Sequence, residues 1–227
     1  MYNVLGKKSP DYEIREWNED NFDITQNLYI KEAYSCKKWA FVSDFVRLVV
    51  VYEYGGIYFD TDVEVIKSFE HLLRTEGYIG FENATNEKNK KTINTGLGFA
   101  APQGDKIILA MLNDYKSIHF LKEGKMDLTA CPERNTKVLK NLGLKTDGSL
   151  QKLGDLIVYP FEYFCGVDLA NSHPVITKNT YTIHHYNASW CDKWSWHLWF
   201  KYRIVVRLIQ KILGYELYDK IKIKLDT

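Results

Sequence analysis

The pair Gly55-Gly56 joins two stretches of chain whose side-chain periodicities differ. Residues 27–54 predict a helix, broken near 35–37, because apolar residues recur there at helical spacing: Phe41, Phe45, Leu48 and Tyr52. The following residues, IYFDTDVEVI, are rich in aromatic and β-branched side chains and predict a strand. Because glycine often follows the last turn of a helix, we expect the helix to end at this pair.

Short strand-like and helical stretches alternate along the rest of the chain. Strands are expected at 12–17, 78–82, 97–101, 156–160 and 180–186, and helices at 103–121, 132–142, 193–213 and 215–224. The polar run 83–94 predicts a mobile loop. The alternation predicts an α/β fold, and 227 residues suffice for one large domain or two small ones.

Net charge and cysteine content restrict the expected partners and the expected compartment of the protein. The net charge of +1 argues against a generally basic nucleic-acid binder, so no nucleic-acid partner is expected. The four cysteines, which predict neither a zinc knuckle nor a disulfide framework, are Cys36, Cys131, Cys165 and Cys191. The first residues lack the apolar core of a secretory signal, and no uncharged apolar run reaches the length of about 18 residues that a membrane span needs. We therefore expect a cytoplasmic, reducing compartment.

The sharpest chemical signal is Asp60-Thr61-Asp62. On a strand, side chains two residues apart point to the same face, so the two carboxylates would lie together. Two neighbouring carboxylates repel each other unless a cation lies between them, and Mg²⁺ or Mn²⁺ is commonly held by a few carboxylates and a substrate's phosphates. The alternative interpretation is a solvated, acidic strand end.

A charged pair precedes these acids. Asp44 and Arg47 lie three residues apart on the predicted helix, hence on one face, and Ser43 is adjacent. The glycine pair allows a sharp turn and a close approach of the backbone to a ligand. The alternative is a surface ion pair that contributes little to stability.

These residues resemble a known family. Ser43-Asp44-Phe45-Val46-Arg47, followed by Tyr54-Gly55-Gly56-Ile57-Tyr58-Phe59-Asp60-Thr61-Asp62-Val63-Glu64, resembles the Asp-x-Asp region of glycosyltransferase family 32. That family includes capsule and surface-polysaccharide transferases and fungal mannosyltransferases, and it is related to the glucosylating domains of clostridial toxins. Downstream, His184-His185-Tyr186-Asn187-Ala188-Ser189-Trp190 is similar to the family's His-His-x-x-x-Ser-Trp ending, and Pro10–Glu13 with Trp17-Asn18 resembles its second strand region.

The resemblance implies a GT-A-like, three-layer fold with a mixed central sheet over residues 1–190, and a retaining glycosyltransferase that moves a sugar from a nucleotide-sugar donor to a saccharide acceptor. A UDP-sugar is expected ahead of GDP-mannose, and the acceptor site would lie in loops such as 83–96 and 122–135. The implied role is capsule or surface-polysaccharide synthesis.

The resemblance also implies site residues. The metal, Mn²⁺ or Mg²⁺, would be bound by Asp60, Asp62 and either His184 or His185. The implied catalytic residues are Asp60, Asp62 and Arg47. The implied donor-binding residues are Ser43, Asp44, Arg47, Tyr58, Asp60, Asn94, Ser189 and Trp190. For the histidines the alternative is a strand-end pair bonded to the backbone, and for Asn94 it is a plain turn.

The two ends of the chain depart from the family pattern. Family members usually open with a strand that helps to cradle the nucleotide base, and residues 1–9 resemble only a remnant of the helix that follows it. We therefore expect the N-terminal strand to be missing and donor binding to be weak. Residues 191–227 form a basic, aromatic tail, where two amphipathic helices are expected to contact an anionic membrane surface, with a lipid-linked acceptor, or to pack on the core.

Two other functions fit the acid pair less well. A phosphotransferase with an Asp-x-Asp nucleophile would require a later acidic pair for Mg²⁺. Gly154-Asp155 could supply one of these acids, but the second acid of a Gly-Asp-x-x-x-Asp motif does not follow it. A non-catalytic or truncated GT-A-like binding protein would keep the metal site without turnover.

Overall fold

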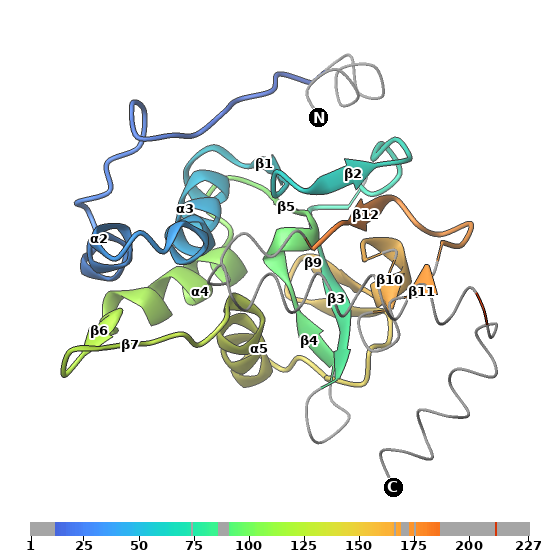
Figure 1. Ribbon diagram of the computed structural model, residues 1–227. Helices are drawn as coiled ribbons and strands as arrows, with labels where there is room; N and C mark the ends of the chain where they lie inside the picture. The colour runs from blue at the N-terminus through green and yellow to red at the C-terminus, as the bar shows by residue number, and fades with distance from the viewer. Residues whose placement is uncertain are drawn as a thin grey trace, which may run out of the picture.

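The computed structural model describes residues 12–73, 75–85, 91–165, 167–168, 173–174, 176–186 and 212. Over these residues the chain forms a mixed α/β fold with helices beside a central sheet, as expected from the sequence (Figure 1). The helices are α2 (Leu28–Ser35), α3 (Trp39–Tyr54), α4 (Lys106–Lys116) and α5 (Cys131–Asn141), with short 3₁₀ turns η1 (Thr95–Leu97) and η2 (Phe161–Tyr163).

The helix pair before the glycines is confirmed. Asn27 caps α2 by accepting a hydrogen bond from the Tyr29 N–H at 2.8 Å. Lys37 takes a φ of 57° in the break before α3. Gly55, with a φ of 67°, ends α3, and a Cβ there would lie 2.8 Å from the backbone nitrogen of Gln103. Only glycine fits this exit, which turns the chain directly into the first strand.

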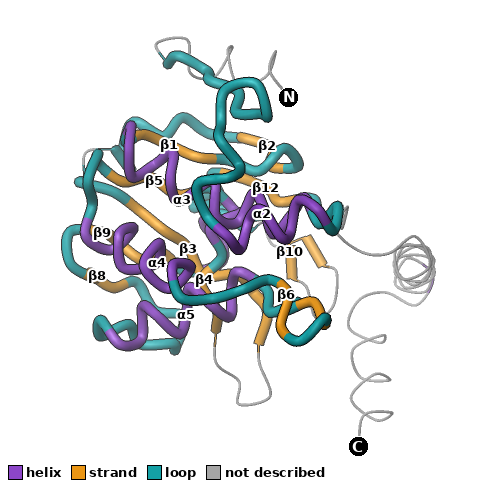
Figure 2. The backbone as a smooth tube through the Cα atoms, turned by 90° about the vertical axis from the view of Figure 1, so that its left-hand side faces the viewer, coloured by secondary structure: helices purple, strands orange, loops and turns teal. Residues whose placement is uncertain are grey.

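The central sheet has the strand order β1-β5-β3-β9-β8, and β4 also pairs with β3. These strands are β1 (Gly56–Tyr58), β3 (Tyr78–Thr85), β4 (Lys91–Ile93), β5 (Phe99–Ala101), β8 (Gln151–Leu153) and β9 (Leu156–Tyr159). The β3–β9 pair is parallel and the other pairs are antiparallel, so the sheet is mixed as expected. The four helices gather on one side of it (Figure 2).

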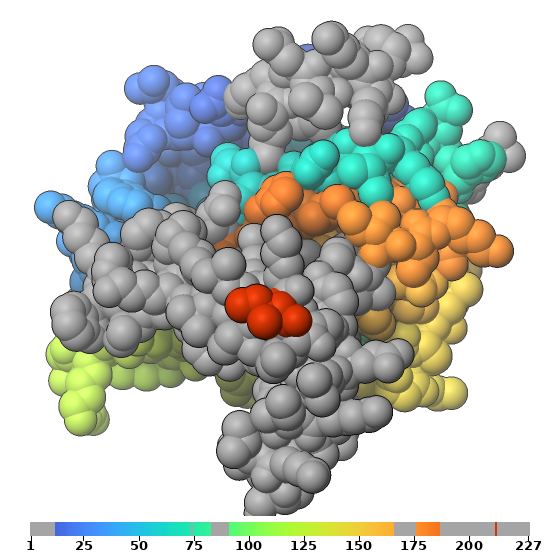
Figure 3. Space-filling model, turned by 45° about the vertical axis from the view of Figure 1, so that its right-hand side comes forward, coloured from blue at the N-terminus to red at the C-terminus, as the bar shows by residue number. Residues whose placement is uncertain are grey.

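Three small two-stranded sheets complete the described fold. They are β2 (Val63–Val65) with β12 (Thr182–His184), β6 (Leu121–Lys122) with β7 (Lys125–Met126), and β10 (Val167–Asp168) with β11 (His173–Pro174). The β2 and β12 segments lie side by side on the surface in Figure 3. This pairing joins distant parts of the sequence next to the acid pair.

Two apolar clusters hold the layers together. The larger one packs the helices on the sheet and is centred on fully buried residues such as Tyr29, Leu48, Ile79, Phe99 and Ile108. Phe41 and Phe45 belong to it, so the predicted apolar face of α3 is confirmed, although Tyr52 is only partly buried. The second cluster lies around Phe69, Tyr78 and Phe164. None of the helices in the described residues is long and apolar enough to cross a membrane.

Two elements expected from the sequence differ in the structure. Residues 12–17 form no strand; Trp17 instead packs on the Tyr54 ring, with centroids 5.0 Å apart. The helix expected at 103–121 begins only at Lys106, because Asp105 caps it by accepting hydrogen bonds from Ile107 and Ile108.

The expected loops also contain regular structure. The predicted loop 83–94 includes the end of β3 and all of β4. The segment 122–135, assigned to a variable loop, contains the turn of the β6–β7 hairpin and the start of α5. The strand expected at 97–101 begins at Phe99, because η1 occupies Thr95–Leu97. The helices expected in the tail lie outside the described residues, except that Ile212 is helical.

Candidate metal and donor site

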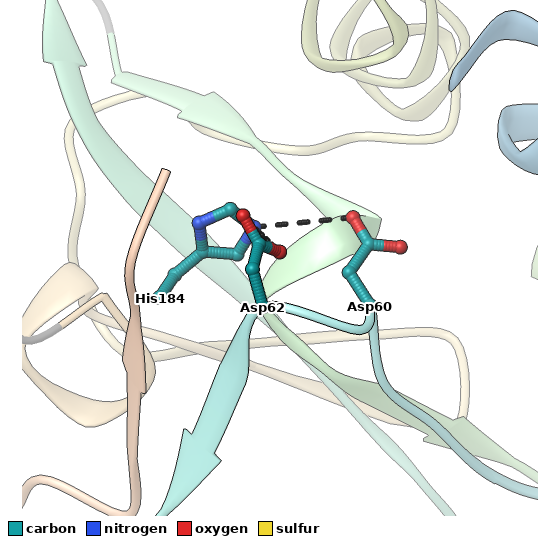
Figure 4. A group of neighbouring side chains, drawn as sticks. All are labelled: Asp60, Asp62 and His184. Atoms are coloured by element: carbon teal, nitrogen blue, oxygen red, sulfur yellow. Dashed lines mark ion pairs between the residues drawn. The ribbon is translucent and has the colours of Figure 1, made fainter. Parts of the chain in front are cut away.

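Asp60, Asp62 and His184 converge at the β2–β12 pair, and we call them the Asp–Asp–His cluster (Figure 4). Each residue offers one ligand atom, and these atoms lie within 4.8 Å of one another. Nε2 of His184 lies 3.3 Å from Oδ1 of Asp62 and 3.9 Å from Oδ2 of Asp60. The antiparallel register, which pairs His184 with Val63, carries the imidazole to the acids.

The two acids lie in a turn, not on a strand. Strand β1 ends at Tyr58 and β2 begins at Val63, and the Val63 N–H donates to the Asp60 carbonyl oxygen at 3.1 Å. The expected strand alternation is therefore wrong at this point. The tight turn nevertheless places the two carboxylates within reach of one ion.

Arg47 occupies the buried side of the site and is 3% exposed. Its Nη2 lies 3.0 Å from Oδ1 of Asp44 and 3.1 Å from Oδ1 of Asp60. Its Nε donates to the Ser43 carbonyl oxygen at 3.1 Å, and Nη2 donates to the Ser43 hydroxyl at 3.0 Å. The interpretation of Asp44 and Arg47 as a surface ion pair is wrong, because Arg47 is buried, Asp44 is only 13% exposed at its side chain, and the pair links α3 to the acid turn.

The two oxygens of Asp60 face different partners. Oδ1 receives the Tyr58 hydroxyl at 2.9 Å and faces the Arg47 guanidinium, whereas Oδ2 faces His184. Burial acts to raise the pKa of Asp60, but the charge of Arg47 and the hydrogen bonds of His184 and Tyr58 outweigh it and lower that pKa. Asp60 is thus kept ionised, with Oδ2 directed at the cluster.

Asp44 lies in a different electrostatic environment. Burial raises its pKa from 3.8 to about 6, with a further contribution from the negative charge of Asp60, although Arg47 acts against the shift. The Cys131 thiol at the start of α5 is hydrogen-bonded to Asp44, and its sulfur lies 3.2 Å from the Thr95 hydroxyl oxygen. Cys131 was not predicted as a site residue, because a lone buried cysteine carries no sequence signal of its neighbours.

The structure separates the two adjacent histidines. His184 is 6% exposed and belongs to the cluster, whereas Nε2 of His185 lies 3.1 Å from Oε2 of Glu64, in a half-exposed ion pair. Nδ1 of His184 accepts the Tyr186 backbone N–H at 3.0 Å, so the neutral ring carries its proton on Nε2, facing Asp62. Ligation of a metal through Nε2 requires the other tautomer, with the proton on Nδ1, and that tautomer would give up the hydrogen bond from Tyr186.

The donor set fits a hard divalent cation. Two carboxylates and one imidazole within 4.8 Å are ligands that Mn²⁺ accepts, and the carboxylates also suit Mg²⁺, with phosphate and water oxygens completing the shell. Some of the other donor-binding residues implied by the family resemblance lie near the cluster. Tyr58 and Ser43 contact Arg47, and Asn94 caps η1, which borders Asp60. Ser189 and Trp190 lie outside the described residues.

A groove of about 780 Å³ opens beside the site. Ser43, Tyr58 and Thr61 line it at the end near Asp60. The rest of the lining includes apolar side chains of α3, the rings of Trp39 and Tyr54, and the segment 12–19 with Trp17. A cavity of this size and lining is typical of a small-molecule site.

Comparison with known proteins agrees with this geometry. Residues 1–79 match the family model described as a glycosyltransferase sugar-binding region containing a DXD motif. No curated protein matches the chain significantly. The matched region contains Arg47, Asp60 and Asp62 but ends before Asn94 and His184. It supports a glycosyltransferase in general, with the DXD acids at the centre of the Asp–Asp–His cluster.

Proposed function

We propose that the protein is a divalent-metal-dependent glycosyltransferase of the family 32 type, which moves a sugar from a nucleotide-sugar donor to a saccharide acceptor. The observation that carries this proposal is the convergence of His184 on the two acids of the DXD motif. The buried Arg47 behind one of these acids supports it further.

In this proposal the ion is held by Asp60, Asp62 and His184. When bound, it supplies positive charge for the diphosphate that leaves the donor sugar. Arg47 keeps Asp60 ionised and aims its Oδ2 at the cluster, since Oδ1 is taken by Arg47 and Tyr58. Nε2 of His184 lies 3.3 Å from Oδ1 of Asp62, so these two atoms would be neighbouring ligands of the ion.

The groove beside the cluster is proposed to hold the nucleoside of the donor. Its lining is mostly apolar and includes exposed rings, Trp39 at 52% and Tyr54 at 57%, on which a base can stack. Ser43 and Tyr58 line the groove and also contact Arg47. The phosphates of a donor bound in the groove would therefore lie near Arg47 and the acids.

Retention of anomeric configuration is proposed from the family resemblance. Attack of the acceptor hydroxyl on the face that the diphosphate leaves requires no protein nucleophile. Asp44 and Asp60 are each paired with Arg47, which agrees with such a mechanism. The anomeric form of the product, determined by NMR, tests this part.

The central experiment is Mn²⁺-dependent hydrolysis of UDP-glucose, UDP-galactose, UDP-N-acetylglucosamine and GDP-mannose. We expect turnover of one donor, with a UDP-sugar ahead of GDP-mannose, and loss of turnover with chelator. Asp62→Asn is the matched variant, because it keeps the size of the side chain and removes its charge. Metal binding without turnover of any donor would favour a binding protein, and phosphate release from a phosphorylated substrate would favour a phosphotransferase.

A role in surface-polysaccharide synthesis on a cytoplasmic membrane face is also proposed, on the composition of the tail. Co-sedimentation with anionic liposomes, for the full chain and for a chain ending at Asp192, tests it. Equal binding of the two chains would remove the tail from this role.

A further inference from the structure

Glu82 is a buried carboxylate on β3 that the proposed reaction does not use. It is 6% exposed, and each of its oxygens accepts one hydrogen bond. Oε1 receives the hydroxyl of Thr92, its cross-strand partner on β4, at 2.7 Å, and Oε2 receives the Asn94 side-chain amide at 2.9 Å. Because both oxygens are engaged and buried, Glu82 acts on its protein neighbours and not on a substrate.

Asn94 connects Glu82 to the Thr95–Leu97 turn. Its Oδ1 accepts the Gly96 N–H at 2.7 Å, and its own backbone N–H donates to the Gly80 carbonyl oxygen at 3.2 Å. A carboxylate can only accept and a backbone N–H can only donate. The amide group of Asn94 therefore has one possible orientation, with its NH₂ toward Glu82 and its oxygen toward Gly96.

Gly96 in turn lies against the first acid of the cluster. A Cβ at this position would be 2.4 Å from Oδ2 of Asp60 and 3.0 Å from Nη1 of Arg47. Asp60 Oδ2 is the oxygen that faces His184. Glu82, Asn94 and Gly96 thus form a continuous series of contacts from the sheet to a proposed metal ligand.

We propose that Glu82 is a positioning residue for the metal site. Through Asn94 it fixes the Thr95–Leu97 turn, and this turn limits where the Asp60 carboxylate can lie. The inference rests on the proposed function, since it assigns Asp60 to the metal. It extends the site to a residue of the sheet interior that lies beyond the DXD motif.

The test reverses the polarity of one hydrogen bond. Glu82→Gln removes the charge, although its amide oxygen can still accept from Asn94 while its NH₂ faces the Thr92 hydroxyl, and in Asn94→Asp two carboxylates face each other. The double variant combines Glu82→Gln with Asn94→Asp, so that the new amide donates to the new carboxylate, whose other oxygen still accepts the Gly96 N–H. Of these three variants, only the double one keeps both the hydrogen bonds and the single negative charge.

The readout is the Mn²⁺ dissociation constant, measured without donor from the electron paramagnetic resonance signal of free Mn²⁺. We expect Asn94→Asp to bind Mn²⁺ about tenfold more weakly, the effect typical of groups that orient a metal ligand. Glu82→Gln should lose less affinity than Asn94→Asp, and the double variant should return to within about threefold of the wild type. Glu32→Gln is the matched control, because Glu32 also accepts two hydrogen bonds, from His119 and the Leu121 N–H, away from the cluster. It should lose stability without losing Mn²⁺ affinity.

Each outcome separates the inference from the proposed function. A wild-type chain that does not bind Mn²⁺ contradicts the proposed function and the inference with it. Wild-type binding with unchanged affinity in Asn94→Asp, or a double variant that binds Mn²⁺ no more tightly than Asn94→Asp, overturns the inference alone. A loss of donor hydrolysis at unchanged Mn²⁺ affinity would assign Glu82 to the substrate and overturn the positioning role. If a single variant does not fold, rescue in the double variant still decides.

Discussion

One side of the Asp–Asp–His cluster comes from a single stretch of chain, residues 43–62, and the other side comes from separate segments around Glu82, Asn94 and His184. On the first side Arg47 lies one helical turn from Asp44 and reaches Asp60 at 3.1 Å. On the second side, contacts depend on the pairing of β3 with β4 and of β2 with β12.

The two sides therefore have different sensitivities. The first is a packed set of opposite charges, and removing one charge leaves its buried partners uncompensated. The second depends on strand register, since a slip of one residue in β12 would exchange His184 for His185 at the acids. The difference shows that the acids and the arginine are brought together by one stretch of chain, whereas the third ligand is supplied by a distant strand.

The largest effect on Mn²⁺ affinity is expected at Asp62, which faces His184 across the cluster. Asp62→Asn should weaken Mn²⁺ binding by at least about a hundredfold, because groups that merely orient a ligand already contribute about ten- to a hundredfold. Isothermal titration with Mn²⁺ measures the change. An affinity within a few-fold of the wild type would place the ion elsewhere.

Gly96→Ala is expected to weaken Mn²⁺ binding by about 10- to 100-fold, since the added methyl group would lie 2.4 Å from Oδ2 of Asp60. The matched control is Gly77→Ala, whose methyl group would lie 2.5 Å from the Ala100 carbonyl oxygen and from Leu156, in the core. Both variants should lose stability, but only the first should lose metal affinity. Equal losses of affinity would mean that the turn does not position Asp60 specifically.

Asp44 makes the stability of the first side depend on pH. Its pKa is raised from 3.8 to about 6, so the folded state holds the proton more tightly than the unfolded state. The resulting stabilisation is fully present below the unfolded pKa of 3.8 and is lost as the pH rises through about 6. Relative to Asp44→Asn, the wild-type free energy of unfolding should therefore fall by about 2 kcal/mol between about pH 4 and pH 7.

Urea titrations of both proteins across this range measure the difference. The charged groups that act on Asp44 are Arg47, Asp60 and Arg134. All three are unchanged in the variant. A difference that stays constant with pH would contradict the raised pKa.

The smallest effect is expected on the second side. His184→Gln should weaken Mn²⁺ binding by only about tenfold, because it removes no negative charge and leaves an amide oxygen that can replace the imidazole as a ligand. It should also narrow the preference for Mn²⁺ over Mg²⁺, because imidazole favours transition metals more than amide oxygen does. His185→Gln, at the Glu64 ion pair, should produce the smaller change of the two. The opposite order would indicate a shifted β12 register in solution.

The sequence predicted the features that depend on near neighbours. Helical spacing placed Asp44 and Arg47 on one face, the glycine pair marked the end of α3, and the motif identified Asp60 and Asp62 as a pair. The helix–strand alternation also predicted the α/β fold, and the family resemblance implied the mixed sheet. These features could be predicted because backbone geometry over one or two turns depends on the residues within it.

Other features followed only from the tertiary structure. Residues 12–17 have a strand-like composition but form no strand, and the acids occupy a turn that alternation did not predict. The choice between His184 and His185 required the β2–β12 register. Glu82 is the last residue of the expected strand 78–82, and its hydrogen bonds appear only once β4 pairs with β3. The physical reason is that burial and partner choice are set by which distant segments meet, and no local pattern contains that information.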